Sequence, residues 1–471
     1  MRIRKNVWTL PAGDPTLDWY AKAVAAMRAL PITNPLSWRY QAAIHGYPGP
    51  QGDPLATPGE SMPPSAEQET YWQQCQHSTS FFVSWHRMFL LHFERIVAAQ
   101  VAALGGPADW ALPYWDYSTR PAWRLLPEAF RNARLGDGTP NPLYVEARNA
   151  DANAGRSFLH KYDVDVSACL RAPAGTATSG FFGPPPANHS GGAFGALEST
   201  PHNQVHVQAG SNAVGGWMLD PDLAALDPIF WLHHSNIDRL WEVWLRRDPA
   251  HQNLTTPYWL TGVSFAFHDA TGAPVTMQSQ EVLDMTKPPL DYGYEDTSDP
   301  LAPAPRAQAL VGAAAQHELV GATLGSVDLA DDTVHAELPT PVSPSAFQLA
   351  RTPTSAPGGL QHVTLRLENV TSTHPGPMYD VYLNVPEADR PDQHEDLHVG
   401  RAAMFGVAQA SKKSAQHGGS GQTFAFDITE LYNRLSAAGA VDPKRLRVSF
   451  VPVRASKNAP VRVGRVSLYF G

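Results

Sequence analysis

The pattern that most constrains this chain is a set of histidines placed among aromatic residues. His202 and His206 are four residues apart, so on one helix both imidazoles leave the same face and can meet one metal ion. Residues 227–238 begin with Asp-Pro, which suits a helix N-cap and first turn, and then repeat apolar residues at helical spacing. His234 lies two turns into that predicted helix. A third imidazole from this position would complete a three-histidine site with an open coordination position, as a catalytic metal requires.

A second group of histidines lies upstream and strengthens the case, since a His-x-x-x-His pair alone is common on ordinary helices. Its members are His45, His77 and His86. No carboxylate is interleaved with either group at ligand spacing, and neutral imidazole suits copper. Zinc with three histidines stays possible, but two all-histidine sites fit dioxygen chemistry better than hydrolysis. The sequence therefore favours two copper ions, with O2 as co-substrate.

These motifs resemble the type-3 dicopper proteins, the family of tyrosinases, catechol oxidases and molluscan haemocyanins. The run from Asp227 to Trp241 is similar to the most recognisable signature of that family, and the motifs span roughly residues 36–245. The resemblance leaves His233 outside the ligand set. It implies six copper ligands: His45, His77, His86, His202, His206 and His234. It also implies a mainly α catalytic domain, with long loops around a four-helix-bundle dicopper core.

The resemblance also suggests a role for one of the two cysteines. Cys75 lies two residues before His77, and in fungal-type members of the family the matching cysteine forms a thioether with the histidine ring. A free thiol and a disulfide between Cys75 and Cys169 are the alternatives. A reducing compartment disfavours the disulfide.

Glu198 and Asn203 bear on which reaction the chain performs. Glu198 lies four residues before His202, and Asn203 directly follows that histidine. In family members that hydroxylate monophenols, a glutamate and an asparagine at matching positions hold a water that takes the phenol proton. General-base assistance of this kind contributes about 10²–10⁴ in rate. The alternative is that Glu198 caps the following turn and Asn203 makes only local hydrogen bonds.

Further residues are expected around the ligands, namely Phe82, Phe89, Phe230, Val207 and Asp238. The three phenylalanines are expected to fix the imidazole rings and keep the pocket dry. Val207 is expected to line the entrance, and Asp238 to form a buried ion pair. His92, six residues after His86, is expected to be structural.

Periodicity predicts helices over residues 14–30, 37–44 and 82–103, with Gly46 ending the second. Residues 120–200 lack clear periodicity, which suggests loops around the mouth of the active site. These helices and loops would make up a catalytic domain over residues 1–297.

The period changes from helix to strand in the last third of the chain. Residues 298–308 are rich in proline and predict a linker, followed by a domain over residues 309–471. Alternating segments predict an antiparallel β-sandwich or barrel there: residues 362–368, 379–384, 422–427, 445–451 and 461–470.

The run Tyr379–Asn384 resembles the C-terminal domain of plant polyphenol oxidases. That resemblance implies a lid over the copper site, with Met404 and Phe405 as candidates for the side chain that plugs it. A purely structural appendage is the alternative.

Composition excludes several classes of protein. With 43% hydrophobic and 17% charged residues among 471, the chain is typical of a globular protein, and no apolar run of about 18 residues predicts a membrane span. A net charge of -9 disfavours nucleic acid as a partner. The first ten residues show neither the apolar core of a signal peptide nor a twin-arginine signal, so a cytoplasmic location is the default expectation and secretion stays open.

We therefore expect a dicopper phenol oxidase that uses O2 to ortho-hydroxylate monophenols and to oxidise o-diphenols to o-quinones. Its expected partner is a small phenolic substrate, and a homo-oligomer stays open. One alternative is a catechol or o-aminophenol oxidase without hydroxylation. Another is an oxygen carrier like haemocyanin, against which the single dicopper motif without a tandem repeat argues.

Overall fold

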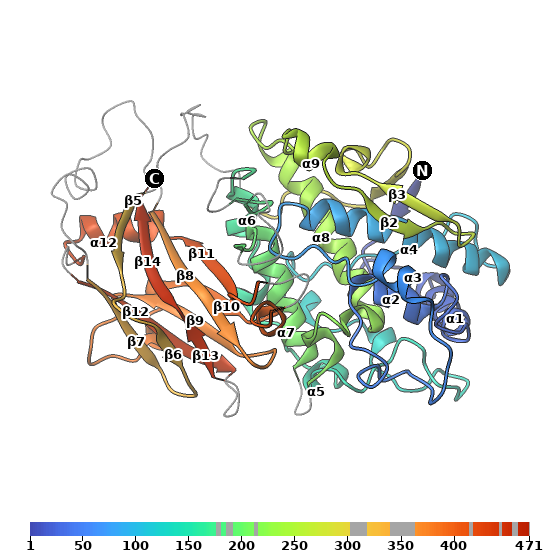
Figure 1. Ribbon diagram of the computed structural model, residues 1–471, viewed down its shortest axis with the longest axis horizontal. Coiled ribbons are helices and arrows are strands. Elements are labelled where there is room, and N and C mark those ends of the chain that lie inside the picture. The colour runs from blue at the N-terminus through green and yellow to red at the C-terminus, as the bar shows by residue number, and fades with distance from the viewer. Residues whose placement is uncertain are drawn as a thin grey trace. The chain divides into compact units, whose positions relative to one another are not determined.

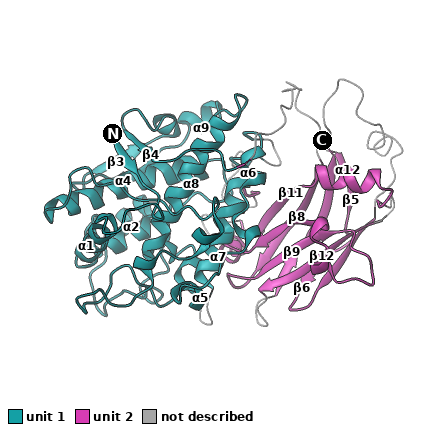
Figure 2. Cartoon of the chain, turned by 180° about the vertical axis from the view of Figure 1, so that it is seen from behind, with its two compact units in different colours: residues 1–175, 180–185, 196–300 teal, residues 176–179, 186–195, 301–471 magenta. Residues whose placement is uncertain are grey.

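The computed structural model describes residues 1–175, 180–184, 192–211, 215–301, 318–339, 363–413, 418–441, 445–454 and 460–470. The chain divides into two compact units (Figures 1 and 2). Unit 1 comprises residues 1–175, 180–185 and 196–300. Unit 2 comprises residues 301–471 together with residues 176–179 and 186–195, so part of the sequence between two stretches of unit 1 belongs to unit 2.

Unit 1 has a helical core. Its longer helices are α1 (Thr16–Arg28), α2 (Trp38–His45), α4 (Phe82–Ala103) and α8 (Pro228–Arg247). Its shorter α-helices are α3 (Ser65–Tyr71), α5 (Ala150–Asn153), α6 (Ser167–Arg171), α7 (Gln204–Gly210) and α9 (Pro257–Thr261). The three helices predicted from periodicity are confirmed by α1, α2 and α4. The arrangement of the core as a four-helix bundle stays a prediction.

The ends of these helices follow from local chemistry. Ser37 caps α2 by accepting a hydrogen bond from the Tyr40 backbone, and Asp227 caps α8 by accepting one from Ile229. Gly46 ends α2 in extended backbone, not in a left-handed turn. A Cβ at Gly46 would lie 2.6 Å from the carbonyl oxygen of Pro221, so close approach of two backbones explains the glycine.

Unit 1 also contains two small sheets that periodicity does not predict. β1 (Arg2–Arg4) pairs in parallel with β4 (Tyr292–Tyr294), and β2 (Phe265–His268) pairs with β3 (Pro274–Met277). Between residues 120 and 200 the described chain is mostly irregular, as expected. Its 3₁₀ helices in this region are Pro121–Arg124, Glu128–Phe130 and Lys161–Val164, and later ones in unit 1 are Trp217–Leu219, Ala224–Leu226 and Ser279–Val282.

Unit 2 is built from two antiparallel sheets that share one hydrophobic core. One sheet has the order β10-β9-β12-β7, and the other has the order β5-β14-β8-β13-β6 with β11 also paired to β8. The strands are β5 (Glu318–Ala322), β6 (Val327–Leu329), β7 (Val334–Pro339), β8 (Val363–Ser372), β9 (Met378–Leu383), β10 (His398–Ala403), β11 (Gln422–Asp427), β12 (Arg445–Arg454), β13 (Val461–Val463) and β14 (Arg465–Phe470). Two short helices, α11 (Val407–Ala410) and α12 (Thr429–Ala437), and the 3₁₀ turns Pro391–Gln393 and Glu395–Leu397 complete the unit.

The predicted strands of the C-terminal region are confirmed by β8, β9, β11 and β12, and the last one divides into β13 and β14 at Gly464. Most of the predicted linker, residues 302–308, lies outside the described residues. The lid role stays a prediction, although Met404 packs in the hydrophobic core of unit 2. Across the described ranges, no helix has the length and apolar character needed to cross a bilayer.

Candidate metal centre

Seven of the described histidines gather in two groups, as the sequence predicts for six of them. The first consists of His45, Cys75, His77 and His86, and the second of His202, His206, His233 and His234. Within each group the potential ligand atoms lie within 4.8 Å of one another. All six predicted ligands are therefore brought together, three in each group. The structure adds Cys75 to the first group and His233 to the second.

The first group combines two helices with a loop. His45 is the last residue of α2 and His86 lies in the second turn of α4, whereas Cys75 and His77 lie in the loop between α3 and α4. The Nδ1 atom of His45 lies 2.9 Å from the carbonyl oxygen of Pro221, and that of His86 lies 2.7 Å from the carbonyl oxygen of Phe82. A carbonyl oxygen can only accept, so both rings carry their proton on Nδ1 and present the Nε2 lone pair.

The second group lies entirely on helical backbone. His202 is in the turn Glu198–Asn203, which is interrupted by extended dihedrals at Thr200 and leads directly into α7 with His206. The ring centroids of His202 and His206 are 4.5 Å apart, in agreement with the predicted common face. His206 donates from Nδ1 to the carbonyl oxygen of Met218 at 2.8 Å, so its Nε2 carries the lone pair, as in His45 and His86.

His202 and His234 complete the predicted set in the second group. His202 donates from Nδ1 to the Asn203 Oδ1 at 2.8 Å. His234, on α8, places its Nε2 3.3 Å from the Nε2 of His206. The His234 and His86 rings stack at a centroid distance of 4.4 Å and an angle of 10°, so the two groups adjoin. Two metal ions bound there would be neighbours.

Aromatic side chains surround these imidazoles at the predicted positions. The Phe82 ring lies 4.7 Å from the rings of both His86 and His202. The ring centroid of Phe230 lies 4.2 Å from that of His234 and 5.0 Å from that of His45. The ring centroid of Phe89 lies 6.4 Å from that of His45. Val207, which the sequence places at the entrance, is fully buried on α7.

Burial keeps five of the six predicted ligand histidines neutral. Desolvation lowers the pKa of His45 to about 4 and that of His206 to about 3, and it also lowers the pKa of His86, His202 and His234 well below the ordinary value. Neutral imidazole is the form that binds copper. The donor set therefore fits copper ions in composition, tautomer and charge.

Glu198 contacts the backbone next to a ligand of the first group, and Asn203 contacts a ligand of the second. Both carboxylate oxygens of Glu198 accept hydrogen bonds from the backbone N–H of Ser78, at 2.9 and 3.0 Å, and Ser78 directly follows His77. Glu198 is only 1% exposed. Asn203 uses its Oδ1 on His202, and its buried Nδ2 has no hydrogen-bond partner in the part of the chain that the structure describes. A buried donor without a partner can hold a water or a substrate oxygen.

Cys75 and His233 are the two members of these groups that are not among the predicted ligands. The Cys75 Sγ lies 3.4 Å from the Nε2 and 3.7 Å from the Nδ1 of His77, and 3.4 Å from the Nε2 of His86. Both cysteines are free, and no disulfide joins Cys75 to Cys169. His233 places its Nδ1 3.0 Å from the hydroxyl of Tyr117, a partner that sequence reasoning missed although Tyr117 stands in a recognisable aromatic run.

A network of buried charges holds α4 to α8 behind the histidines. Asp238 accepts hydrogen bonds from Arg87 at 2.5 Å, from Tyr292 and Tyr294 at 2.6 Å each, and from Arg4 at 3.2 Å. Burial alone would raise the pKa of Asp238, but Arg87 and Arg4 hold it below the ordinary value. The predicted buried ion pair of Asp238 is thus present.

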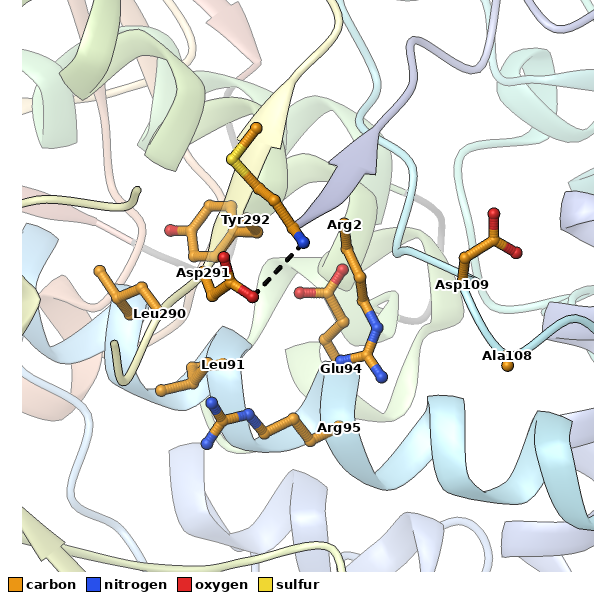
Figure 3. Close-up of a pocket in the computed structure, with 10 residues that line it drawn as sticks. Arg2, Leu91, Glu94, Arg95, Ala108, Asp109, Leu290, Asp291 and Tyr292 are labelled. Carbon is orange, nitrogen blue, oxygen red and sulfur yellow. Dashed lines mark ion pairs between the residues drawn. The ribbon is translucent and has the colours of Figure 1, made fainter. Parts of the chain in front are cut away.

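A surface hollow of about 380 Å³ lies elsewhere on unit 1 (Figure 3). Its lining includes Arg2, Arg95 and Asp291, and Asp291 pairs with the N-terminal ammonium at 3.4 Å. No histidine of either group lines it. The hollow is therefore separate from the candidate metal centre.

Family models match three parts of the chain. Residues 35–247 match the common central domain of tyrosinase, and residues 253–305 match the polyphenol oxidase middle domain. Residues 316–471 match a domain of unknown function (DUF7868). The first match contains both histidine groups.

Comparison with individual proteins gives similar results. The chain is 35% identical to the tyrosinase HcTyr1 of Hahella sp. (strain CCB-MM4), over 100% of this chain and 99% of that protein. It is 27% identical to the chloroplastic polyphenol oxidase of Spinacia oleracea, over 64% of this chain and 48% of that protein, so it spans about half of that relative.

Two solved structures resemble the whole chain. The latent apple tyrosinase matches with a TM-score of 0.66 at 21% identity, over 100% of this chain and 97% of that one. A latent aurone synthase matches with a TM-score of 0.67 at 22% identity, over 100% and 89% respectively. At these identities the structural likeness shows a common fold.

Proposed function

This chain belongs to the tyrosinase family, and from that membership we propose that it hydroxylates monophenols at the ortho position as well as oxidising o-diphenols to o-quinones. The cofactor is the type-3 dicopper centre of the family, and the family acts on phenolic substrates. Hydroxylation is the finer part of the proposal. Geometry at Glu198 and Asn203 supports it.

We assign three ligands to each copper ion: His45, His77 and His86 to the first, and His202, His206 and His234 to the second. Four of these rings, His45, His86, His202 and His206, present Nε2 because an oxygen acceptor holds Nδ1. When bound, the copper ions supply the binding and activation of O2 and the binding of a phenolate. The protein supplies the fixed, dry imidazole cage.

The step that distinguishes the two activities is removal of the phenol proton, because only the phenolate is a good copper ligand. Two buried groups carry the proposal. The Glu198 carboxylate is held by hydrogen bonds from the Ser78 backbone, and the Asn203 Nδ2 has no hydrogen-bond partner among the described residues. The amide can orient a water whose proton acceptor is the carboxylate. Glu198 then takes the proton, through that water, from the incoming phenol.

The test compares Glu198→Gln and Asn203→Asp in copper-loaded protein, with O2 uptake followed for a monophenol and for the matching catechol. We expect monophenol turnover to fall by about 10²-fold or more, because general-base assistance is worth that much, and catechol turnover to change little. Glu368→Gln in unit 2, which removes a half-buried carboxylate far along the chain, serves as the control. Equal losses on both substrates would refute hydroxylation through this pair.

A catechol oxidase without hydroxylation is the second candidate. Asn203 Oδ1 already accepts a hydrogen bond from His202 Nδ1. Asn203 could therefore act only by orienting the His202 ring. In that case Asn203→Asp would change copper content and both activities in parallel.

We also propose that Cys75 forms a thioether with His77. Its Sγ lies within 3.7 Å of both ring nitrogens, which flank the carbon at which the bond would form. The S–H and C–H bonds break and the S–C bond forms, and the two protons and two electrons pass to O2, giving hydrogen peroxide. The mass of the chain falls by two hydrogen atoms.

A further inference from the structure

A short stretch just before Glu198 belongs to unit 2. Residues 192–195 are the described part of the segment 186–195, which lies in the sequence between residues 180–185 and 196–300 of unit 1 yet belongs to unit 2. Ala193 forms a parallel bridge with Thr423 of β11. The Phe194 N–H donates to the carbonyl oxygen of Thr423, and the Thr423 N–H donates to that of Gly192, each at 3.4 Å. These residues thus extend the sheet of unit 2.

The side chain of Phe194 strengthens this attachment. It is 4% exposed and is part of the hydrophobic core of unit 2. Its ring lies 5.3 Å from that of Phe424, at an angle of 61°, which is a favourable edge-to-face arrangement. Removal of Phe194 from this core would expose one of the largest apolar side chains, so the segment is firmly held.

Only three residues separate Phe194 from Glu198. Gly195 is followed by Ala196, whose N–H donates to the carbonyl oxygen of Gly180 at 2.8 Å, and by Leu197, which is fully buried. The helical turn with Glu198 and His202 begins immediately afterwards. Four Cα–Cα steps span at most about 14 Å, so the attachment of Phe194 limits where this turn can begin.

We propose that Phe194 is a positioning residue for Glu198. Its ring, held in the core of unit 2, fixes the start of the turn that places the Glu198 carboxylate against the Ser78 backbone. The segment that carries Phe194 therefore helps to position the Glu198 carboxylate through the chain itself. The catalytic consequence rests on the proposed function of Glu198, but the positioning itself does not.

The experiment uses full-length, copper-loaded protein with three variants. Phe194→Ala removes the anchor, Phe194→Leu keeps an apolar anchor, and Phe470→Ala serves as a matched control. Phe470 is also a buried phenylalanine of the unit 2 core, but it packs on Tyr432 and lies in β14. Both alanine variants lose the same side chain from the same core, so they share any general loss of stability.

The first readout is amide hydrogen exchange in the peptides that contain Ser78 and residues 196–203. The Ser78 N–H reports directly on its hydrogen bonds to Glu198. We expect about 10-fold faster exchange there in Phe194→Ala, near-normal exchange in Phe194→Leu and no change in Phe470→Ala, because local opening sets the exchange rate. Unchanged protection in Phe194→Ala, or an equal rise in Phe470→Ala, would overturn the proposal. If Phe194→Ala does not fold, Phe424→Leu tests the same contact from the other side under the same criteria.

The second readout is the ratio of monophenol to catechol turnover. A fall in this ratio in Phe194→Ala, with faster exchange at Ser78, supports both the positioning role and the base role of Glu198. Faster exchange with an unchanged ratio supports the positioning role and refutes the base role. The failure of one idea is thereby separated from the failure of the other.

Discussion

The two histidine groups achieve similar donor sets on different backbones. The second lies wholly on helical backbone, and all of its four imidazoles are buried. The first takes Cys75 and His77 from a loop, where both are only partly buried, and two residues of that loop, Gln73 and Ser78, have positive φ angles. A helix fixes a ligand through its own hydrogen bonds, whereas a loop needs additional contacts. Here those contacts are Cys75 beside the His77 ring and Glu198 on the Ser78 backbone.

This difference teaches where each group is vulnerable. In the second group, copper binding should be weakened mainly by substitution of a ligand histidine, because helices hold the backbone. In the first group the position of His77 depends on side chains outside the ligand set. The following predictions test the contrast, starting with the largest expected effect.

The largest expected effect concerns which of two adjacent histidines, His233 or His234, is a copper ligand. We expect His234→Ala to lose one copper ion and all O2 uptake with either substrate, because its Nε2 meets that of His206. We expect His233→Ala to keep two copper ions, because the family resemblance leaves His233 outside the ligand set and its Nδ1 lies 3.0 Å from the Tyr117 hydroxyl. Copper content and O2 uptake are measured for both variants. Loss of copper in His233→Ala but not in His234→Ala would make His233 the ligand.

The charge network behind both groups should have the next largest effect. Asp238 lies one turn after His234 and binds Arg87, the neighbour of His86. Asp238→Ala leaves the buried Arg87 and Arg4 without their shared carboxylate, which we expect to lower the free energy of unfolding by about 3–5 kcal/mol. Asp284→Ala, which removes an exposed carboxylate paired with Lys287, should cost at most about 1 kcal/mol.

Urea unfolding of the copper-free chain measures both variants without a contribution from the metal. If the two midpoints shift equally, the network does not join α4 to α8 as described, and the two groups are held independently.

Sequence reasoning succeeded where the signal is local. Asp227 and Pro228 mark the start of α8 because capping depends only on adjacent residues, and the alternation of residues 422–427 matches β11. The predicted histidines assemble because helical spacing fixes the relation of His202 to His206. Each of these features is encoded within a few turns of chain.

Contacts between distant segments were not predictable in this way. The pairing of Glu198 with the Ser78 backbone joins residues 120 positions apart, and a single sequence gives no measure of such proximity. The pairing of β1 with β4, and the insertion of Phe194 into the core of unit 2, depend on tertiary packing for the same reason. The contact that links Glu198 to the loop of His77 is of the same kind, because it joins segments far apart in the sequence.

His92 provides a control histidine outside both groups. Burial lowers its pKa to about 4, with Arg95 adding to the effect, and its Nε2 contacts the sulfur of Met277 at 3.1 Å. Because the unfolded chain binds this proton near pH 6.5 and the folded chain does not, His92 lowers stability as the pH falls from about 6.5 to about 4. The total loss is about 3 kcal/mol.

His92→Leu should therefore flatten the dependence of unfolding free energy on pH in that window, measured on the copper-free chain. His374→Leu, a change at an exposed histidine of unit 2, gives the matched comparison. Parallel curves for His92→Leu and the unchanged chain would contradict the assigned protonation state of His92.

The smallest expected effect concerns the loop ligand itself. Cys75→Ala removes the proposed thioether, so His77 regains rotational freedom, and we expect a chelator to remove copper about 10-fold faster, a loss typical of residues that orient a ligand. Cys169→Ala, which removes a buried free thiol on α6, should leave the rate unchanged. Mass spectrometry of the peptide with Cys75 and His77 should show the loss of two hydrogen atoms only after copper and O2 have been supplied. An unmodified peptide together with faster copper loss would mean that Cys75 restrains His77 by packing alone, and the contrast between a loop ligand and helical ligands would stand without the cross-link.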